Sequence, residues 1–498
     1  MKKIFSLLIL VFASMLSTKA QNVRVSIDTT IVTNHTTTIK QQTIPYKATT
    51  GFQPVWDESG TPIASLSYTY YKRSDIKNDE KRPLVISFNG GPGSASVWMH
   101  IAYTGPRILK IDEEGFPVQP YGIKANPNSI LDVADIVFVN PVNTGYSRMI
   151  PGSDGKMPEK ELFFGVQADV KYLAGWINTF VSRNNRWRSP KYLIGESYGT
   201  TRVSGLALEL QNQHWMYLNG VILVSPTEIG FKFAGPVEVA NRLPYFTAAA
   251  WYHKMLPPEL QNKDLSEILP EVENYTINEL LPAIVKSGYL EKDKKENVIT
   301  KMAYYSGLSK KTIRQHNLEV PKAYFWKDLL RDKDGYTIGR LDSRYKGMDI
   351  KEAGEAPDYN SELTSWLHSF TPAINYYYSQ ELNFKTDLKY NMFGSVRPWD
   401  RTKGNQTGEN LRKAMAMNAN LHTMIQSGYY DGATTYFNAK YVMWQLNANG
   451  KLTDRLSFKG YRSGHMMYLR NEDLIQANDD IRAFITKSSA NISKGSKY

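Results

Sequence analysis

The 498-residue chain contains no cysteine. This absence excludes disulfide bonds, thiolate metal sites and cysteine nucleophiles. A chain of this length can instead rely on a large apolar core, and 42% of its residues are hydrophobic. A His-Glu-x-x-His motif is also missing. We therefore expect chemistry that needs neither a metal ion nor another cofactor.

Long apolar runs are missing as well. No stretch beyond the N-terminus approaches the roughly 20 apolar residues that a membrane span requires. At the N-terminus, Lys2 and Lys3 precede an apolar run at residues 4–15 and then Thr-Lys-Ala, ending at Ala20. This pattern is typical of a signal peptide, so we expect cleavage near Ala20 and a secreted or periplasmic protein. The alternative, a single membrane anchor, is disfavoured because the run is too short.

The chain has little clustering of charge, although its formal net charge is +12. Residues 1–20 carry three lysines and no acid, which leaves 57 basic against 48 acidic residues, or +9, after cleavage. The basic residues are scattered and not interleaved with aromatic ones, so we expect no nucleic-acid partner. An acidic polymer or a carboxylate substrate remains open.

Short apolar runs alternate with amphipathic helical patterns in the first half of the chain. The helical patterns lie at residues 166–180 and just after Ser197. This alternation predicts an α/β fold with a largely parallel sheet. The expected strands are residues 65–70, 84–88, 136–139, 192–194, 221–225, 421–425 and 456–458.

The strand–helix rhythm stops after Ser225-Pro226. The next stretch is helical and aromatic without strand alternation, and we interpret it as an inserted cap. The predicted organisation is a signal peptide (1–20), a first core part (21–230), a helical cap (231–410), a second core part (411–487) and a disordered tail (488–498).

Two glycine motifs directly follow predicted strands. Residues 89–93 read Asn-Gly-Gly-Pro-Gly, and residues 195–199 read Gly-Glu-Ser-Tyr-Gly. The second has the Gly-x-Ser-x-Gly form of a nucleophile elbow, a tight turn that presents the hydroxyl of Ser197. The first can supply backbone N–H groups to a developing oxyanion, and we expect Gly91 and Tyr198 to be the donors. The pair predicts acyl transfer through Ser197.

A serine nucleophile needs a histidine base, and the chain has eight histidines. His465 lies in a Ser-Gly-His-Met loop just beyond the last predicted strand, where a mobile catalytic histidine belongs. His422 falls inside a predicted strand, and His253 and His368 fall in helical segments. We interpret these three as packed or surface residues and His465 as the base.

The base in turn needs an orienting acid, which should follow a strand and precede the histidine. Asp431 meets both conditions, because it comes just after the predicted strand at 421–425. Asp454 competes with it but precedes the last strand. Taken alone, Asp431 could be a turn aspartate before a glycine. Together with the elbow and His465, it predicts a Ser-Asp-His triad.

These ordered motifs resemble the serine carboxypeptidase family. The similarity rests on the two glycine motifs, on Gly-His-Met at residues 464–466, and on the loop at 140–147. Residues 243–253 and 339–345 are similar to the cap of the family's bacterial branch. The resemblance covers roughly residues 50–487 and implies an α/β-hydrolase with a mostly parallel central sheet and a helical cap insertion.

The resemblance also implies an activity. Its members release single residues from the C-termini of peptides, usually at acidic pH, and the triad would be Ser197, Asp431 and His465. Asn89, Gly90 and Glu196 would bind the terminal carboxylate of the substrate, with Glu196 protonated. A neutral carboxyl can donate a hydrogen bond to a carboxylate, whereas an ionised one repels it. The structural alternative for Glu196 is a carboxylate that stabilises a helix N-terminus.

Two positions depart from the family pattern. Many relatives have a cysteine where this chain has Ser94, which suggests only a lost disulfide. A second glutamate, two residues before a Gly-Pro, helps to bind the carboxylate in relatives, but here that residue is Tyr103. The acid pair is therefore missing, which leaves open a weaker acidic optimum. His100 and Arg107 lie nearby, and Arg107 or Arg148 could contribute a charge instead.

We therefore expect a secreted serine carboxypeptidase that acts on peptides, as a monomer or homodimer. The alternative is an esterase or acyltransferase with the same triad. A third hypothesis, a non-catalytic envelope protein, predicts a broken triad, and no member is missing. Residues that select the cleaved side chain should lie in the cap, where Tyr245 and Tyr252 are candidates.

Overall fold

The computed structural model describes residues 26–152 and 154–490, so the predicted signal peptide lies outside the described residues. One large sheet runs through the molecule in the strand order β1-β2-β3-β7-β4-β9-β10-β13-β14, with β8 beside β3. Its strands are β1 (Thr30–Ile39), β2 (Gln42–Trp56), β3 (Pro62–Arg73), β4 (Leu84–Phe88), β7 (Asp135–Val139), β8 (Arg148–Met149), β9 (Lys191–Glu196), β10 (Gly220–Val224), β13 (His422–Gly428) and β14 (Leu456–Tyr461).

Six neighbouring strands, from β7 to β14, are parallel, and β1–β3 continue the sheet as an antiparallel edge. Every residue of β4, β7, β9 and β10 is buried. Continuous apolar runs of this kind suit parallel strands that are covered on both faces. The predicted α/β class with a mostly parallel sheet is confirmed.

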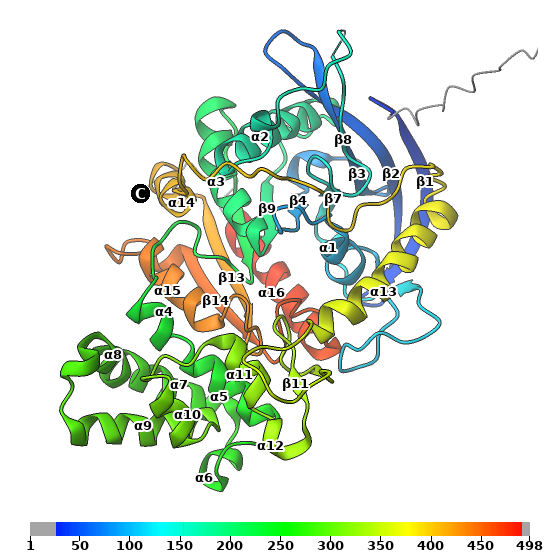
Figure 1. The fold of residues 1–498 in the computed structure, drawn as a ribbon. Helices are drawn as coiled ribbons and strands as arrows, with labels where there is room; N and C mark the ends of the chain where they lie inside the picture. The colour runs from blue at the N-terminus through cyan, green and yellow to red at the C-terminus, as the bar shows by residue number, and fades with distance from the viewer. Residues whose placement is uncertain (1–25, 153, 491–498) are drawn as a thin grey trace, which may run out of the picture.

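Helices cover both faces of the sheet (Figure 1). Alternate residues of a strand point to opposite faces, and in β4 Val85 joins one core while Leu84 and Ile86 join the other. The core that contains Leu84 includes α2 (Val166–Arg183), α3 (Tyr198–Gln213), α14 (Thr407–Met417) and α15 (Tyr436–Leu446), and the core that contains Val85 includes α1 (Val97–Ala102), α13 (Ser361–Tyr376) and α16 (Asn471–Ser489).

A group of helices has a separate apolar core, formed by side chains between residues 240 and 338. Figure 1 shows these helices, in green, at one end of the molecule beyond α15 and β14. They are α4 (Pro236–Ala240), α5 (Leu243–Tyr252), α6 (Pro258–Gln261), α7 (Leu265–Tyr275), α8 (Leu281–Lys286), α9 (Lys292–Ser306), α10 (Lys310–Gln315), α11 (Lys322–Asp328) and α12 (Arg331–Asp334). We call this group the cap.

Apolar packing divides the segment 231–410. Trp366 and Phe370 of α13, and Tyr390 and Met392 beyond it, belong to the core on the sheet and not to the cap core. The short strand pairs are β5 (Arg107–Leu109) with β6 (Ile123–Ala125), and β11 (Thr337–Ile338) with β12 (Lys346–Gly347). The domain boundaries drawn from the sequence stay a prediction.

Helix α16 corrects the predicted tail. It continues to Ser489, two residues into the segment that was expected to be disordered from 488 onward. Ser488 is buried and its hydroxyl bonds the Tyr192 hydroxyl at 2.9 Å and the Phe484 carbonyl at 2.7 Å. The bond to Tyr192 holds the last turn against β9. Residues 491–498 lie outside the described part of the chain.

Candidate active site

Ser197 occupies a tight turn between β9 and α3. Its backbone has φ 57° and ψ −125°, a strained conformation for a residue with a side chain, and its N–H donates to the Val224 carbonyl at 2.9 Å. A Cβ at Gly195 would lie 2.2 Å from the Gly199 carbonyl oxygen, so only glycine fits there. The chain therefore forms a nucleophile elbow at the predicted position, with a half-buried serine at its apex.

The first glycine loop packs directly against this elbow. A Cβ at Gly90 would lie 2.5 Å from the Tyr198 nitrogen and 2.7 Å from the Glu196 carbonyl oxygen. Within the described part of the chain, neither the Gly91 nor the Tyr198 N–H donates a hydrogen bond. For Tyr198 this follows from its place at the start of α3, where N–H groups lack a partner in the helix. Both predicted oxyanion donors thus lie at one junction.

His465 and Asp431 form a buried pair. The His465 Nδ1 lies 2.7 Å from the Asp431 Oδ2. The other oxygen of Asp431 accepts the N–H groups of Ala433 and Thr434 at 2.8 and 3.0 Å. Burial alone would lower the pKa of His465, but the charge and hydrogen bond of Asp431 outweigh it, so the pKa is raised. The structure thus joins the two residues proposed from sequence as acid and base.

Two further groups hold this pair, and sequence analysis missed both. The Thr434 hydroxyl lies 2.7 Å from Asp431 Oδ2 and 3.2 Å from His465 Nδ1. The Ser225 hydroxyl donates to the His465 carbonyl at 2.7 Å and ties the histidine loop to the end of β10. A threonine three residues after an aspartate is a common turn pattern, so the sequence carries no specific signal for its role.

The described residues contain no hydrogen bond between Ser197 and His465. Ser197 follows β9, His465 follows β14, and the strands between them are β10 and β13. In unliganded hydrolases the bond from nucleophile to base is often long and tightens when substrate binds.

In the described part of the chain, the other histidine and acid candidates make no hydrogen bond to the His465–Asp431 pair. The His253 Nε2 lies 2.5 Å from the Ser343 carbonyl oxygen. His368 is exposed on α13 and its Nδ1 bonds the Thr364 carbonyl. His422 begins β13, and burial lowers its pKa to about 4. Asp454 is exposed in the turn before β14.

Glu196, the residue before the nucleophile, is buried between two side chains. The Asn89 Nδ2 donates to its Oε1 at 2.9 Å, and the Tyr468 hydroxyl bonds its Oε2. The Asn89 Oδ1 accepts the Met99 N–H at 3.0 Å, which fixes the orientation of the amide. Burial raises the pKa of Glu196 to about 7, against the opposing effects of His465 and of these hydrogen bonds.

Tyr103, at the place of the missing second acid, makes no hydrogen bond to Glu196 among the described residues. Its ring stacks on that of Tyr468, with centroids 4.5 Å apart and planes 9° apart, and its hydroxyl donates to the Gln426 Oε1 at 2.6 Å. Tyr468 was not singled out from the sequence, because it lies 272 residues from Glu196.

The three alternative groups have other partners. Arg107 pairs with Glu381 at 2.6 Å, and Arg148 donates to the carbonyl oxygens of Gly145, Ser147 and Lys389. His100 is buried, 2.6 Å from the Tyr71 hydroxyl. At Ser94, the hydroxyl accepts the Trp98 indole N–H at 2.8 Å.

A buried ion pair between Arg202 and Asp169 contacts both glycine motifs. Arg202 of α3 donates to the Asn89 carbonyl at 2.6 Å and to the Asp169 carboxylate of α2 at 2.8 Å. Its guanidinium also lies over the ring of Tyr198, 5.3 Å from the centroid. An arginine beside Val203 on an apolar helix face is the signal that could have revealed this pair, since a buried charge requires a partner.

The two cap tyrosines differ in exposure. Tyr245 is fully buried, accepts the Trp326 indole N–H at 2.8 Å and packs against Gly432, behind the Asp431 turn. Tyr252 is half-buried, with its ring 5.3 Å from that of Tyr430.

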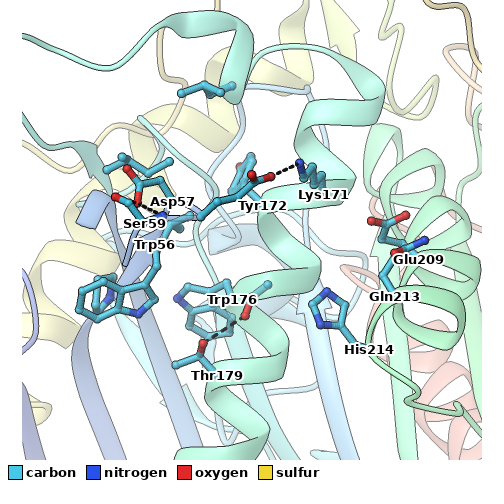
Figure 2. A pocket seen from close by; sticks show the side chains of 16 residues that line it. Trp56, Asp57, Ser59, Lys171, Tyr172, Trp176, Thr179, Glu209, Gln213 and His214 are labelled. Atoms are coloured by element: carbon cyan, nitrogen blue, oxygen red, sulfur yellow. Dashed lines mark hydrogen bonds and ion pairs between the residues drawn. The ribbon is translucent and has the colours of Figure 1, made fainter. Parts of the chain in front are cut away.

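The described residues enclose several hollows. One of about 320 Å³ lies against residues 91–93 and is lined on its other side by residues 393–397. A larger one of about 770 Å³ lies between β2, α2 and α3, around Trp56, Trp176 and His214 (Figure 2). It includes none of the site residues above, so we assign no part of the chemistry to it.

Two searches concern the described ranges 26–152 and 154–490 only. They contain no helix long and apolar enough to cross a membrane. They also contain no group of three or more histidine, aspartate or glutamate side chains placed to hold a metal ion.

A parallel sheet flanked by helices, a serine at a strand-to-helix elbow and a His-Asp pair beyond later strands define the class as a serine-type α/β-hydrolase. The chain belongs to the serine carboxypeptidase family, whose family model matches residues 39–461. The family and the fold inferred from the sequence are confirmed.

Similar proteins agree with this assignment. Serine carboxypeptidase-like 36 of Arabidopsis thaliana is 29% identical over 183 residues, covering 34% of this chain and 35% of that protein. The retinoid-inducible serine carboxypeptidase of Homo sapiens is 30% identical over 146 residues, covering 29% and 28%. The matched segments thus span about a third of these relatives.

A solved structure shares the fold. The prohormone-processing carboxypeptidase Kex1 of Saccharomyces cerevisiae aligns with a TM-score of 0.54 and 15% identity, over 89% of this chain and 92% of that chain.

Proposed function

We propose that this protein is a serine carboxypeptidase that releases C-terminal residues from peptides. The observation that carries this proposal is the buried carboxyl of Glu196, directly before the nucleophile and with a pKa of about 7. A neutral carboxyl beside the reacting serine can donate a hydrogen bond to the free carboxylate of a peptide end. An esterase for neutral substrates has no need of such a group.

In the acylation step, the Ser197 Oγ attacks the carbonyl carbon of the last peptide bond and gives its proton to His465 Nε2. Asp431 accepts the Nδ1–H of the imidazolium and stabilises its charge. The N–H groups of Gly91 and Tyr198 stabilise the oxyanion, and each such donor is worth roughly 3–4 kcal/mol. The C–N bond then breaks, and His465 protonates the leaving amino group.

In the deacylation step, His465 accepts a proton from water as the water oxygen attacks the acyl carbon. The second tetrahedral intermediate uses the same two N–H groups. Its collapse breaks the bond to Ser197 Oγ, and His465 returns the proton to the serine. The shortened peptide leaves with a new carboxylate.

Carboxylate binding involves Asn89, Gly90 and Glu196. Below its pKa of about 7, Glu196 is neutral and its O–H can donate to the substrate. The second amide hydrogen of Asn89 and the N–H of Gly90 are the other donors in this proposal. Above that pKa, an ionised Glu196 repels the substrate, so KM for free acids rises with pH.

The cellular context is also part of the proposal. The N-terminal pattern from Lys2 to Ala20 supports export, with cleavage near Ala20, to the periplasm or the medium. The similarity of residues 243–253 and 339–345 to cap segments of the bacterial branch supports a place in that branch. We propose a monomer or homodimer acting on peptides.

The proposal is tested with N-blocked dipeptides, their C-terminal amides and a simple ester, using the purified protein and its Ser197→Ala variant. We expect Ser197-dependent release, with kcat/KM for the free acid at least about 10-fold above that for the amide, as one charge-assisted hydrogen bond allows. Ester cleavage with no preference for a free carboxylate would contradict the proposal and assign Ser197 to esterase or acyltransferase work.

A further inference from the structure

The two oxygens of Glu196 have different partners. Oε1 accepts from the Asn89 amide, whose orientation is set by the Met99 N–H, so Asn89 can only donate to it. Oε2 faces the Tyr468 hydroxyl. The Tyr468 hydroxyl donates to Oε2, and such a bond is stronger to an ionised carboxylate than to a neutral carboxylic acid. Tyr468 therefore favours the ionised form of Glu196, and a neutral Glu196 keeps its own O–H for another acceptor.

The position of the Tyr468 hydroxyl is set by a buried network. Its ring stacks on Tyr103, and the Tyr103 hydroxyl donates to Gln426 at 2.6 Å. The Gln426 side-chain N–H donates to the Tyr461 hydroxyl at 2.8 Å, which in turn donates to Asp480 at 2.9 Å. All five side chains are buried. A satisfied network of this kind has one low-energy arrangement and resists rotation of the ring.

The other titratable groups around Glu196 come from separate elements. His465 and Asp431, from the loops after β14 and β13, act on Glu196 in opposite directions, since the imidazolium favours its ionised form and the carboxylate disfavours it. On the α3 side, Arg202 is paired with Asp169 and directed to the Asn89 carbonyl. Tyr468 is thus the one titratable side chain among the described residues that hydrogen-bonds Glu196.

We infer that Tyr468 is a positioning residue that sets the pH range over which Glu196 accepts the C-terminal carboxylate of a peptide. The inference rests on the proposed carboxypeptidase function. Tyr468 does not touch the reacting atoms. It donates to Oε2 when Glu196 is ionised, and it holds the neutral carboxyl in place so that the acidic proton is available to the substrate.

The experiment measures KM and kcat against pH for a free-acid dipeptide substrate and its C-terminal amide. In the wild type, KM for the free acid should rise with pH as Glu196 ionises. Tyr468→Phe keeps the ring and its stack on Tyr103 but removes a donor to the ionised form. The pH at which KM rises should therefore move upward by about 1 unit, with kcat and the amide kinetics unchanged.

Three variants isolate the effect. Glu196→Gln cannot ionise and should lose the pH-dependent rise in KM, and adding Tyr468→Phe to it should change nothing further. A fluorinated tyrosine at position 468 is a stronger donor and should move the rise to lower pH. The matched control is Tyr305→Phe, which removes a hydroxyl that donates to Glu271 at 2.7 Å within the cap, and it should leave the profile unchanged.

The outcomes separate the two proposals. If the wild type prefers free acids but Tyr468→Phe keeps the wild-type profile, the inference is wrong and the proposed function stands. A change in the pH dependence of KM that is the same for acids and amides also overturns the inference, because the effect then does not depend on the carboxylate of the substrate. If Tyr468→Phe does not fold, the direction of the shift in the fluorinated protein decides. No preference for free acids in the wild type overturns the proposed function and the inference together.

Discussion

Glu196 illustrates how position alone changes the chemistry of a side chain. It belongs to a strand whose residues are all buried, and it is followed by a serine that must reach the surface. Burial penalises the charged carboxylate, and two hydrogen bonds and the His465 charge only partly offset that penalty. The result is an acid that stays mostly protonated at pH values below its pKa of about 7, where an exposed glutamate would already be ionised.

This burial predicts a pH-dependent cost in stability. Between pH 4.5 and about 7, Glu196 ionises in the unfolded chain but stays protonated in the folded one, so the free energy of unfolding falls as pH rises. Glu196→Gln removes this cost. The difference in free energy of unfolding between the variant and the wild type should therefore grow by roughly 3 kcal/mol, in favour of the variant, as the pH rises from 4.5 to about 7.

Urea unfolding at several pH values measures this difference. Glu161→Gln, at an exposed glutamate, is the control and should show no such gain. A Glu196→Gln variant whose difference from the wild type is independent of pH would mean that Glu196 is ionised in the folded protein at acidic pH.

At the scale of elements, the site depends on how closely two loops approach. The loop after β4 and the elbow after β9 meet at Gly90, where there is no room for a side chain. Arg202 of α3 links the same two loops, because it donates to the Asn89 carbonyl and is held in place by Asp169. The distance between the two oxyanion donors is therefore set by the neighbouring parallel strands β4 and β9 and by helix α3, which follows β9.

Gly90→Ala should disturb this junction. Its Cβ would lie 2.5 Å from the Tyr198 nitrogen, a backbone atom that cannot move aside. We expect kcat to fall about 100-fold, as for the loss of one oxyanion donor, and the free energy of unfolding to fall by about 1–3 kcal/mol. Kinetics with a good substrate and urea unfolding measure the two effects.

Gly288→Ala is the matched control, because no atom lies within 4 Å of the Cβ it would add. It should leave both quantities unchanged. If Gly90→Ala retained the wild-type kcat, the placement of Gly91 as an oxyanion donor would be wrong.

At the scale of the whole molecule, the chain has an apolar core on each face of the sheet and a third in the cap. The cap is joined to the rest by a small apolar cluster, in which Leu265 and Leu269 meet Tyr436 and Phe437, and by ion pairs such as Lys440 with Glu273 at 2.7 Å. This cluster is much smaller than the cores on the two faces of the sheet, so the cap is expected to open more readily than the sheet.

Hydrogen exchange tests this expectation. Phe246 of α5 stacks on Phe325 of α11 in the cap core, with centroids 4.0 Å apart. Phe246→Ala should cost the cap about 3–5 kcal/mol, and amides of α5 and α11 should exchange faster while those of β4 and β9 stay protected. Tyr289→Ala, at a side chain that is 97% exposed, is the control. Equal acceleration in cap and sheet would show that they unfold as one unit.

Local patterns in the sequence predicted much of this protein. Short apolar runs predicted the buried strands, and residues 84–88 match β4 from end to end. The elbow was predictable because Gly195, Ser197 and Gly199 are neighbours in the chain and lie between a predicted strand and a predicted helix. The acid and the base followed from a topological rule, that catalytic residues come at the carboxyl ends of successive parallel strands.

Contacts between distant segments could not be predicted in this way. Tyr468 reaches Glu196 across 272 residues, and Arg202 reaches the Asn89 carbonyl across 113. The sequence also did not show that residues 231–410 divide between the cap core and the core on the sheet, since both parts are helical and apolar. Periodicity reports which face of a helix is buried, but not against which partner. That choice is made by the packing of the whole chain, and it decides which groups surround Glu196.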